Sequence, residues 1–252
     1  NPWQLGSETR YHSAEYVHGM ITDLMENHGI RDIYMQDDTF VMNRDNVMRF
    51  CKILIEGEVD ITWSCHGRVD HIDKELLKEM KKAGCWQISL GIESGSQKIL
   101  NNVNKGTTVE QNYRALQLCK EVGMDVKGLF MIGCFGEDHE TVKETINFIK
   151  KVHITDFHMT FFTPFPLTTA MRLWPKYGHF DPSKGLFMGN RPSFIPFGLT
   201  EEELINYRKN IYKTFYLRPK IIFRYSLKLF DIRNLKKIIL SAISFFKYLL
   251  KK

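Results

Sequence analysis

The sequence lacks closely spaced cysteines. Its five cysteines stand one by one, at Cys51, Cys65, Cys85, Cys119 and Cys134, and no CxxC or CxxxCxxC motif occurs. Zinc sites and iron–sulfur clusters use such spacings, so we expect no metal ligands within this chain. Nor do the cysteines form the framework of a disulfide-rich protein, and their scatter favours a reducing, cytoplasmic compartment.

Long apolar runs are also scarce, and the chain begins Asn1-Pro2-Trp3 with neither an initiator Met nor a leader-like apolar segment. We therefore expect a piece of a longer protein, without a signal peptide. The most apolar stretch, Ile238 to Leu250, contains Lys247 and two serines. As a helix it would measure roughly 20 Å, less than the ~30 Å hydrocarbon core of a bilayer. We expect it either to lie on a membrane surface or to pack against another domain.

The composition is that of a globular protein: 252 residues, 43% hydrophobic and 25% charged, with a formal net charge of +6. This length suffices for one large α/β core. Much of the cationic excess follows Arg208, in Arg218, Lys220, Arg224, Lys228, Arg233, Lys236, Lys237, Lys247, Lys251 and Lys252. Such a segment either contacts anionic lipid, making the protein peripheral to a membrane, or forms a solvated helix face. We expect no specific nucleic-acid partner.

Strand and helix patterns alternate along the chain. Short apolar or β-branched runs predict strands at 30–35, 61–65, 86–91, 126–132 and 157–162. Helical spacing predicts helices at 13–28, 44–55, 73–82, 110–122 and 141–152. The alternation predicts an α/β fold with a parallel sheet, either a (βα) barrel or a doubly wound sheet. Polar residues follow all five strands, which predicts one ligand site at the carboxyl edge of the sheet.

Three segments are expected. Residues 1–166 would form the βα core. Residues 167–199, which combine prolines and aromatic residues without a clear period, would form a long ordered loop over the ligand face. Residues 200–252 would form a basic helical extension that begins with a capping box of Thr200 and Glu203.

The stretch from Trp86 to Ser96 contains the most informative strand end. Its apolar run passes into Gly91-Ile92-Glu93-Ser94-Gly95, so a carboxylate and a hydroxyl follow a strand on a glycine-flanked turn. Taken alone, this pattern fits a solvated turn as well as it fits a ligand contact.

Taken in order, the strand-end motifs resemble those of the radical S-adenosylmethionine (SAM) superfamily, and especially of members with an upstream cobalamin (B12)-binding domain. The motifs are Ile33–Phe40, Arg68–Asp70, Ala83–Cys85, Gly91–Ser96, Asn104–Thr108, Met131–Glu137, Pro164–Pro166 and Phe215–Pro219. The resemblance implies a partial (βα)6 TIM-like barrel with a C-terminal helical extension. It further implies a [4Fe-4S] cluster that reduces SAM to a 5′-deoxyadenosyl radical, in a cobalamin-dependent methyltransferase or a cyclase.

The resemblance also assigns SAM contacts. Glu93 and Ser94 match positions that bind the two ribose hydroxyls, and a carboxylate beside a hydroxyl suits that task. Lys105, in an Asn-Lys-Gly turn, matches the basic position that binds the methionine carboxylate, although a surface lysine is the alternative. Arg68 would reach the same ligand or orient Glu93, unless it forms a structural ion pair.

Two further positions belong to this set. Gly133 would let the backbone approach the adenine closely, and Asp38 would bind the amino group of SAM or the substrate. Only one of Asp37 and Asp38 can point inward from an extended chain. Glu137 is expected either near the adenine or in the first turn of the following helix.

The chain departs from the family in one main respect, because the CxxxCxxC loop is not present. We expect the first strand, the cluster cysteines and any cobalamin domain upstream of Asn1, and no radical chemistry from this chain alone. No catalytic residue can be named. A degenerate, non-catalytic barrel that binds SAM or a partner is the main alternative, followed by an ordinary TIM-barrel hydrolase or aldolase. A small, lipid-like substrate and an electron donor such as a ferredoxin or flavodoxin are the expected partners.

Overall fold

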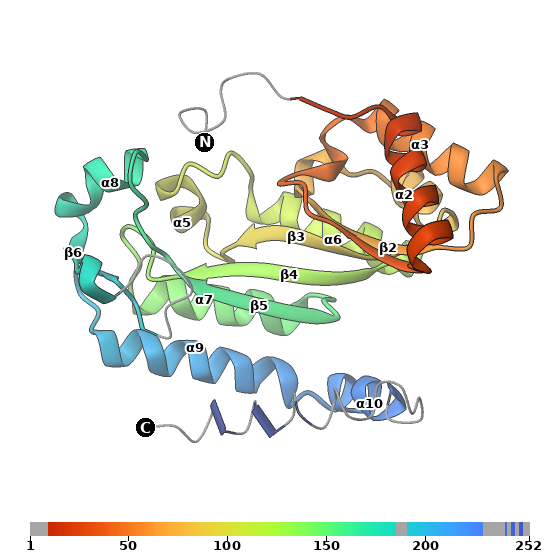
Figure 1. The fold of residues 1–252 in the computed structure, drawn as a ribbon. Helices are drawn as coiled ribbons and strands as arrows, with labels where there is room; N and C mark the ends of the chain where they lie inside the picture. Colours follow the sequence, from red (N-terminus) through yellow and green to blue (C-terminus); the bar gives the residue numbers. More distant parts are fainter. Residues whose placement is uncertain (1–9, 185–190, 229–239, 241–242, 245–246, 249–252) are drawn as a thin grey trace.

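A parallel five-stranded sheet forms the centre of the structure. The computed structural model describes residues 10–184, 191–228, 240, 243–244 and 247–248. The strands pair in chain order, β1 (Asp32–Met35), β2 (Thr62–Gly67), β3 (Cys85–Glu93), β4 (Asp125–Ile132) and β5 (Asp156–Phe161). The sheet curls and helices cover its convex side, so that it forms part of a barrel (Figure 1).

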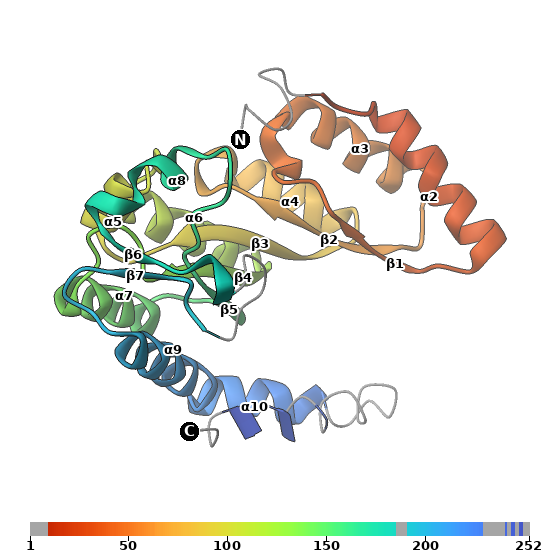
Figure 2. The same cartoon turned by 60° about the vertical axis from the view of Figure 1, so that its left-hand side comes forward.

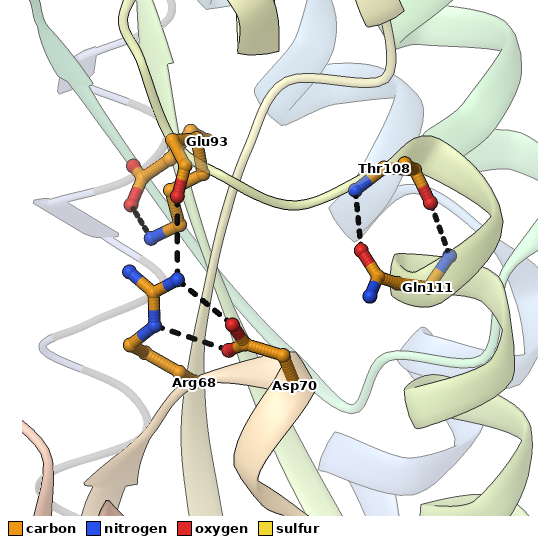
Figure 3. A network of polar contacts seen from close by, with 6 residues as sticks. Arg68, Asp70, Glu93, Thr108 and Gln111 are labelled. Atoms are coloured by element: carbon orange, nitrogen blue, oxygen red, sulfur yellow. Dashed lines mark hydrogen bonds and ion pairs between the residues drawn. The ribbon is translucent and has the colours of Figure 1, made fainter.

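Helices precede the first strand and connect the others. They are α2 (Ala14–His28), α3 (Arg44–Glu56), α4 (Lys74–Lys82), α5 (Gln97–Asn102), α6 (Val109–Val122) and α7 (His139–Lys151). Their ends follow from local capping. Gly29 ends α2 in the left-handed conformation (φ 66°), and Thr108 and Gln111 form a reciprocal capping box at the start of α6 (Figure 3).

The core lies between the sheet and these helices, because alternate strand residues face the convex side. Trp63 of β2 is fully buried, with its ring centroid 5.5 Å from those of Phe40 and Phe50. Its indole N–H donates to the Ala83 carbonyl at 2.7 Å, so the one polar group of this large side chain is satisfied. All five predicted strands and all five predicted helices are confirmed within two residues of their expected bounds.

Residues 167–199 contain short elements rather than a loop without secondary structure. These are α8 (Thr169–Leu173), η3 (Trp174–Lys176), β6 (Gly178–Phe180), η4 (Pro182–Lys184) and β7 (Phe194–Pro196), with β6 and β7 paired antiparallel. The Phe135 ring after β4 stacks on Tyr177 at 4.7 Å and contacts Phe194 at 5.2 Å, which anchors the segment at the carboxyl edge of the sheet. The short strands within this ordered segment were not predicted, because three-residue strands are too short to show a hydrophobic period.

Two helices follow, α9 (Glu201–Tyr216) and α10 (Pro219–Lys228). The expected capping box of Thr200 and Glu203 is confirmed at the start of α9. Phe215 of α9 is fully buried and stacks on Phe157 of β5 at 5.3 Å, so α9 packs beside the last strand. Within the described ranges, no helix is long and apolar enough to cross a membrane. Much of the apolar stretch at 238–250, like residues 1–9, lies outside the described residues.

Candidate functional site

Glu93 ends β3 at the carboxyl edge of the sheet in an unusual backbone conformation. Its φ is 61°, in the left-handed region that non-glycine residues seldom adopt. The pairing of β3 with β4 shifts register between Gly91 and Glu93, so the strand bulges at this point. Such strained positions cluster at ligand sites, and this one sets the direction of the Glu93 carboxylate.

Lys105 forms an ion pair with Glu93 across this edge. Lys105 Nζ lies 2.7 Å from Glu93 Oε1, and the two side chains are only 14% and 18% exposed. Lys105 comes from the connection between α5 and α6, where Asn104 (φ 52°) and Gly106 (φ 74°) turn the backbone. Gly91 leaves room for the pair, because a Cβ there would lie 2.8 Å from Lys105 Nζ and 2.9 Å from Glu93 Oε1.

Arg68 and Asp70 support Lys105 from the end of β2 (Figure 3). Arg68 Nε and Nη2 donate to the two carboxylate oxygens of Asp70 at 3.0 and 2.9 Å, and Nη2 also donates to the Lys105 carbonyl at 3.3 Å. The hydrogen bonds with Asp70 raise the pKa of Arg68. Burial alone would raise the pKa of Asp70, but hydrogen bonds from Arg68 and the backbone outweigh it and lower that pKa. Both groups are therefore charged at neutral pH.

Ser94 follows Glu93 in sequence but has a different environment. Its side chain is fully buried, its Oγ lies 2.9 Å from Thr145 Oγ1 of α7, and it accepts the Ser96 N–H at 3.1 Å. The same Thr145 oxygen accepts the Gly95 N–H at 3.1 Å. Ser94 thus ties the turn after β3 to α7, and its contact with a ribose stays a prediction.

Gly133 lies in the turn after β4, which the carboxylate of Glu137 closes. Gly133 has φ 82°, and its N–H and that of Cys134 (3.0 Å) both donate to Glu137 Oε2. Glu137 is almost fully buried, and this burial raises its pKa to about 7. The alternative that Glu137 lies in the first helical turn is wrong, because Asp138 caps α7 and the helix begins after it.

The structure therefore joins three of the six predicted residues, Glu93, Lys105 and Arg68, in one network. Gly133 follows β4, which pairs with β3 up to Glu93 and Phe130. The roles of all six residues stay predictions.

Asp38 lies apart from this network, exposed after β1. Its charge acts on His66 of β2, whose pKa is lowered by burial and by Lys127 and partly restored by Asp38. Tyr34 Oη hydrogen-bonds His66 Nε2, and the strand register places His66 beside Ser89 and Ser89 beside Lys127. Sequence analysis missed this polar row, although polar side chains at alternate positions of apolar strands were a signal for it.

The cysteines are free, buried thiols. Burial and then a hydrogen bond with Cys65 raise the pKa of Cys85. Burial is the largest cause that raises the pKa of Cys51 and of Cys119 to about 12. The part of the chain that the structure describes contains no group of three or more His, Cys, Asp or Glu residues that could hold a metal ion. Cys134 is fully buried and so packs as a small apolar side chain.

The Glu93–Lys105 network can bind a small ligand that carries hydroxyls and a carboxylate. In the described structure Glu93 uses one carboxylate oxygen for Lys105, and an ionised carboxylate can accept further hydrogen bonds through the other. Lys105 uses one of its three N–H donors for Glu93, leaving two for an anionic group.

Comparisons with known proteins match this chain to a family that is named for SAM. The family model of the radical SAM superfamily matches residues 4–149, more than half of the chain. An uncharacterized methyltransferase of Pyrococcus horikoshii is 32% identical over 232 residues, which cover 88% of this chain and 48% of the relative. An anaerobic magnesium-protoporphyrin IX monomethyl ester cyclase of Rubrivivax gelatinosus is 29% identical over 223 residues, which cover 87% of this chain and 40% of the cyclase. The chain spans less than half of the length of these two relatives.

A solved structure supports the fold. The radical S-adenosylmethionine methyltransferase TsrM from Kitasatospora setae, determined with cobalamin and a [4Fe-4S] cluster bound, superposes with a TM-score of 0.56 and 18% identity. The match covers 62% of this chain and 32% of that one. At this identity the likeness shows the shared partial barrel.

Proposed function

The chain belongs to the radical SAM superfamily, and on this premise we propose that it is the SAM-binding catalytic core of a radical SAM enzyme. The observation that carries the proposal is the Glu93–Lys105 ion pair beside Gly91 at the carboxyl edge of the sheet. Repeating βα folds bind their ligands at this edge. A methyltransferase and a cyclase are among the relatives, so we propose one of these two reaction classes.

Glu93 and Lys105 are proposed to hold two different parts of SAM. The free oxygen of Glu93 would accept hydrogen bonds from the ribose hydroxyls, and the remaining donors of Lys105 would bind the methionine carboxylate. Arg68 would position Lys105 through its hydrogen bond to the Lys105 carbonyl. In these roles Glu93 and Lys105 keep the ion pair between them while each also contacts SAM.

The other three predicted residues are proposed for separate tasks. Gly133, where a Cβ would face Leu204 of α9 at 3.4 Å, would present only its backbone to the adenine. Ser94 would hold the turn after Glu93 through its contact with Thr145, and so serve the ribose contact indirectly. Asp38, exposed after β1, would bind the amino group of SAM or the substrate.

SAM and a reduced [4Fe-4S] cluster, if both were bound at this edge, would supply radical chemistry at the substrate. The cysteines of this chain do not fit such a cluster, because no CxxxCxxC motif is present and the described residues contain no group of three or more Cys, His, Asp or Glu that could hold a metal ion. We propose that sequence outside these 252 residues supplies the cluster ligands and a cobalamin domain. The solved methyltransferase with both groups bound supports this proposal.

The substrate is proposed to be a small, lipid-like molecule. The segment at the carboxyl edge exposes large apolar side chains, among them Leu167 at 74% and Phe197 at 54%, and exposed apolar patches mark sites that bind apolar partners. A ferredoxin or flavodoxin is proposed as the electron donor, since reduction of the cluster requires one.

Titration of the 252-residue chain with SAM in a calorimeter tests the proposal. Glu93→Ala is expected to weaken SAM binding by about 1–3 kcal/mol, the scale of losing a charged hydrogen-bond acceptor. Glu144→Ala, which removes an exposed carboxylate on α7, is the matched control and is expected to bind like the parent. No binding of SAM by the parent, or equal binding by Glu93→Ala, would overturn the assignment.

A non-catalytic SAM-binding barrel is the second candidate, favoured by the missing cluster motif. The codons that precede Asn1 distinguish the two candidates. A CxxxCxxC motif there, together with 5′-deoxyadenosine formed from SAM after reconstitution and reduction of the longer protein, supports the enzyme. SAM binding without that motif and without that product supports the second candidate.

A further inference from the structure

The two C-terminal helices expose an apolar surface. α10 buries Ile221, which is 5% exposed, and Arg224 of α10 forms an ion pair with Asp125 of β4. The opposite side of α10 and the residue that follows α9 leave four large apolar side chains at least half exposed: Leu217, Ile222, Phe223 and Leu227. We call these four residues the α10 patch.

The α10 patch lies far from the proposed SAM site. Asp125, which holds α10, is the first residue of β4, whereas Glu93 stands at the opposite, carboxyl edge of the sheet. Figures 1 and 2 show α10 at the end of the molecule away from α5 and α8. A partner bound to the α10 patch would therefore leave the SAM site accessible.

The sequence from the middle of α9 to the end of the chain is strongly basic. From Arg208 to Lys252 the sequence contains thirteen Lys and Arg residues and a single acidic residue, Asp231. Lys213 and Lys220, on α9 and α10, are exposed. A second copy of this chain is a poor occupant, because two such segments would repel each other.

The few described residues after α10 include further exposed apolar side chains. Near its end, Tyr248 accepts a hydrogen bond from Arg208 Nε at 2.9 Å, and its ring packs against Tyr212 of α9 at 5.8 Å. Leu240 and Ile243, which precede Tyr248, are nevertheless exposed. Apolar side chains and cations are thus presented together on this part of the protein.

We propose that the α10 patch docks on an anionic lipid bilayer without crossing it. Apolar side chains on a basic helix enter the boundary between headgroups and acyl chains, while the neighbouring ammonium groups bind lipid phosphates. Phe223 and Leu227 are proposed as the main apolar contacts, and Lys220 is an exposed cation on the same helix. Docking requires neither SAM nor a cluster, so it stands or fails independently of the proposed function.

Co-sedimentation of the 252-residue chain with lipid vesicles tests the proposal. Binding is expected to vesicles of equal parts phosphatidylcholine and phosphatidylglycerol, to be weak on pure phosphatidylcholine, and to fall as salt is added. The double variant Phe223→Ser/Leu227→Ser is expected to bind the anionic vesicles about tenfold more weakly or worse. Lys220→Glu should weaken binding severalfold, whereas Lys78→Glu on α4 should not.

The control for the apolar change is Tyr16→Ser/Met20→Ser, which removes exposed apolar side chains of 55% and 50% exposure from α2. It is expected to bind like the parent, and circular dichroism establishes that each variant is folded. Absence of binding to the anionic vesicles, equal binding to both vesicle types, or undiminished binding by the α10 double variant would each overturn the proposal. Capture of an acidic protein without vesicle binding would overturn it too.

Discussion

Lys105 Nζ and Glu93 Oε1 lie 2.7 Å apart beside Gly91, whose missing side chain leaves the space that both groups occupy. The pair is mostly shielded from solvent, and Glu93 holds a left-handed backbone conformation there. Desolvating two charges and straining the backbone both cost free energy. Stability alone is therefore a poor reason for this arrangement, and ligand binding is a better one.

Gly91→Ala is predicted to separate ligand binding from folding. The new Cβ would meet only the far ends of two flexible side chains, so the free energy of unfolding should change by less than about 1 kcal/mol. Displacing those ends should lower SAM affinity about tenfold. Calorimetric titration and urea unfolding measure the two quantities. Parent-like SAM affinity in this variant would contradict the role of the ion pair.

Arg68→Lys is predicted to weaken SAM binding by about 0.5–1 kcal/mol. It keeps the charge but removes the planar fork that binds Asp70 and the Lys105 carbonyl together. Asp70→Asn leaves the donor to Lys105 in place and should have a smaller effect on SAM affinity. A double-mutant cycle on the free energy of unfolding should give a coupling of about 1 kcal/mol between Arg68 and Asp70. A coupling of zero would show that the hydrogen bonds between Asp70 and Arg68 do not contribute to stability.

The arrangement of strands and helices could be predicted because hydrophobic periodicity and caps are local signals. Gly29, Thr108 and Thr200 mark helix ends by their own chemistry, and the structure places the ends there. The short strands β6 and β7 could not be predicted in this way. They are held by aromatic contacts such as Phe135 with Phe194, which join residues far apart in the sequence.

The places of the site residues at the ends of the strands could be predicted from the sequence. The directions of their side chains could be predicted less well. Neighbouring residues on a regular strand face opposite sides, so Glu93 and Ser94 cannot be assumed to share a ligand. The bulge at Gly91 and the burial of Ser94 against Thr145 depend on tertiary packing. The same limit applies to Glu137, because no local pattern reveals that its carboxylate is buried on two backbone N–H groups.

Gly95→Ala is predicted to destabilise the fold by about 2–3 kcal/mol or more. A Cβ there would lie 2.4 Å from the Cβ of Phe148 and 2.9 Å from the Cα of Thr145, and neither atom can move without shifting α7. Gly19→Ala on α2 is the control. A Cβ added at Gly19 would have no atom within 4 Å, so this substitution should stabilise the helix by about 0.5–1 kcal/mol. Equal unfolding midpoints of the two variants would contradict the close packing of β3 on α7.

Glu137 is predicted to make stability depend on pH between about 4.5 and 7. Burial raises its pKa from 4.5 to about 7, so the folded protein retains a proton that the unfolded chain has already released. This contribution is fully present below pH 4.5 and is lost as the pH rises through 7, a change of about 3 kcal/mol. The glutamine side chain in Glu137→Gln is neutral at every pH. The free energy of unfolding of this variant should therefore lack the change between pH 4.5 and 7.

Urea unfolding of parent and variant at a series of pH values measures the effect. Hydrogen bonds from Lys98 and from the Thr141 N–H lower the pKa of Asp138 from its ordinary 3.8, so this neighbouring carboxylate does not titrate in the window. Glu144→Gln, on the exposed side of α7, should follow the parent. Parallel pH profiles for parent and Glu137→Gln would show that Glu137 is ionised throughout.

The cysteines give the last prediction: the 252-residue chain should form no [4Fe-4S] cluster when reconstituted with iron and sulfide. Cluster ligands are thiolates that converge on the metal, whereas the described residues contain no group of three or more Cys, His, Asp or Glu that could hold a metal ion, and burial, as the largest cause, raises the pKa values of Cys51 and Cys119 to about 12. All five should therefore resist an aromatic disulfide reagent in the native protein and react after unfolding. Visible absorbance and iron analysis measure cluster formation, with a longer protein that carries a CxxxCxxC motif as the positive control. A stoichiometric [4Fe-4S] spectrum from this chain alone would show that its cysteines can rearrange into a ligand set, and would contradict the proposal that the ligands come from outside it.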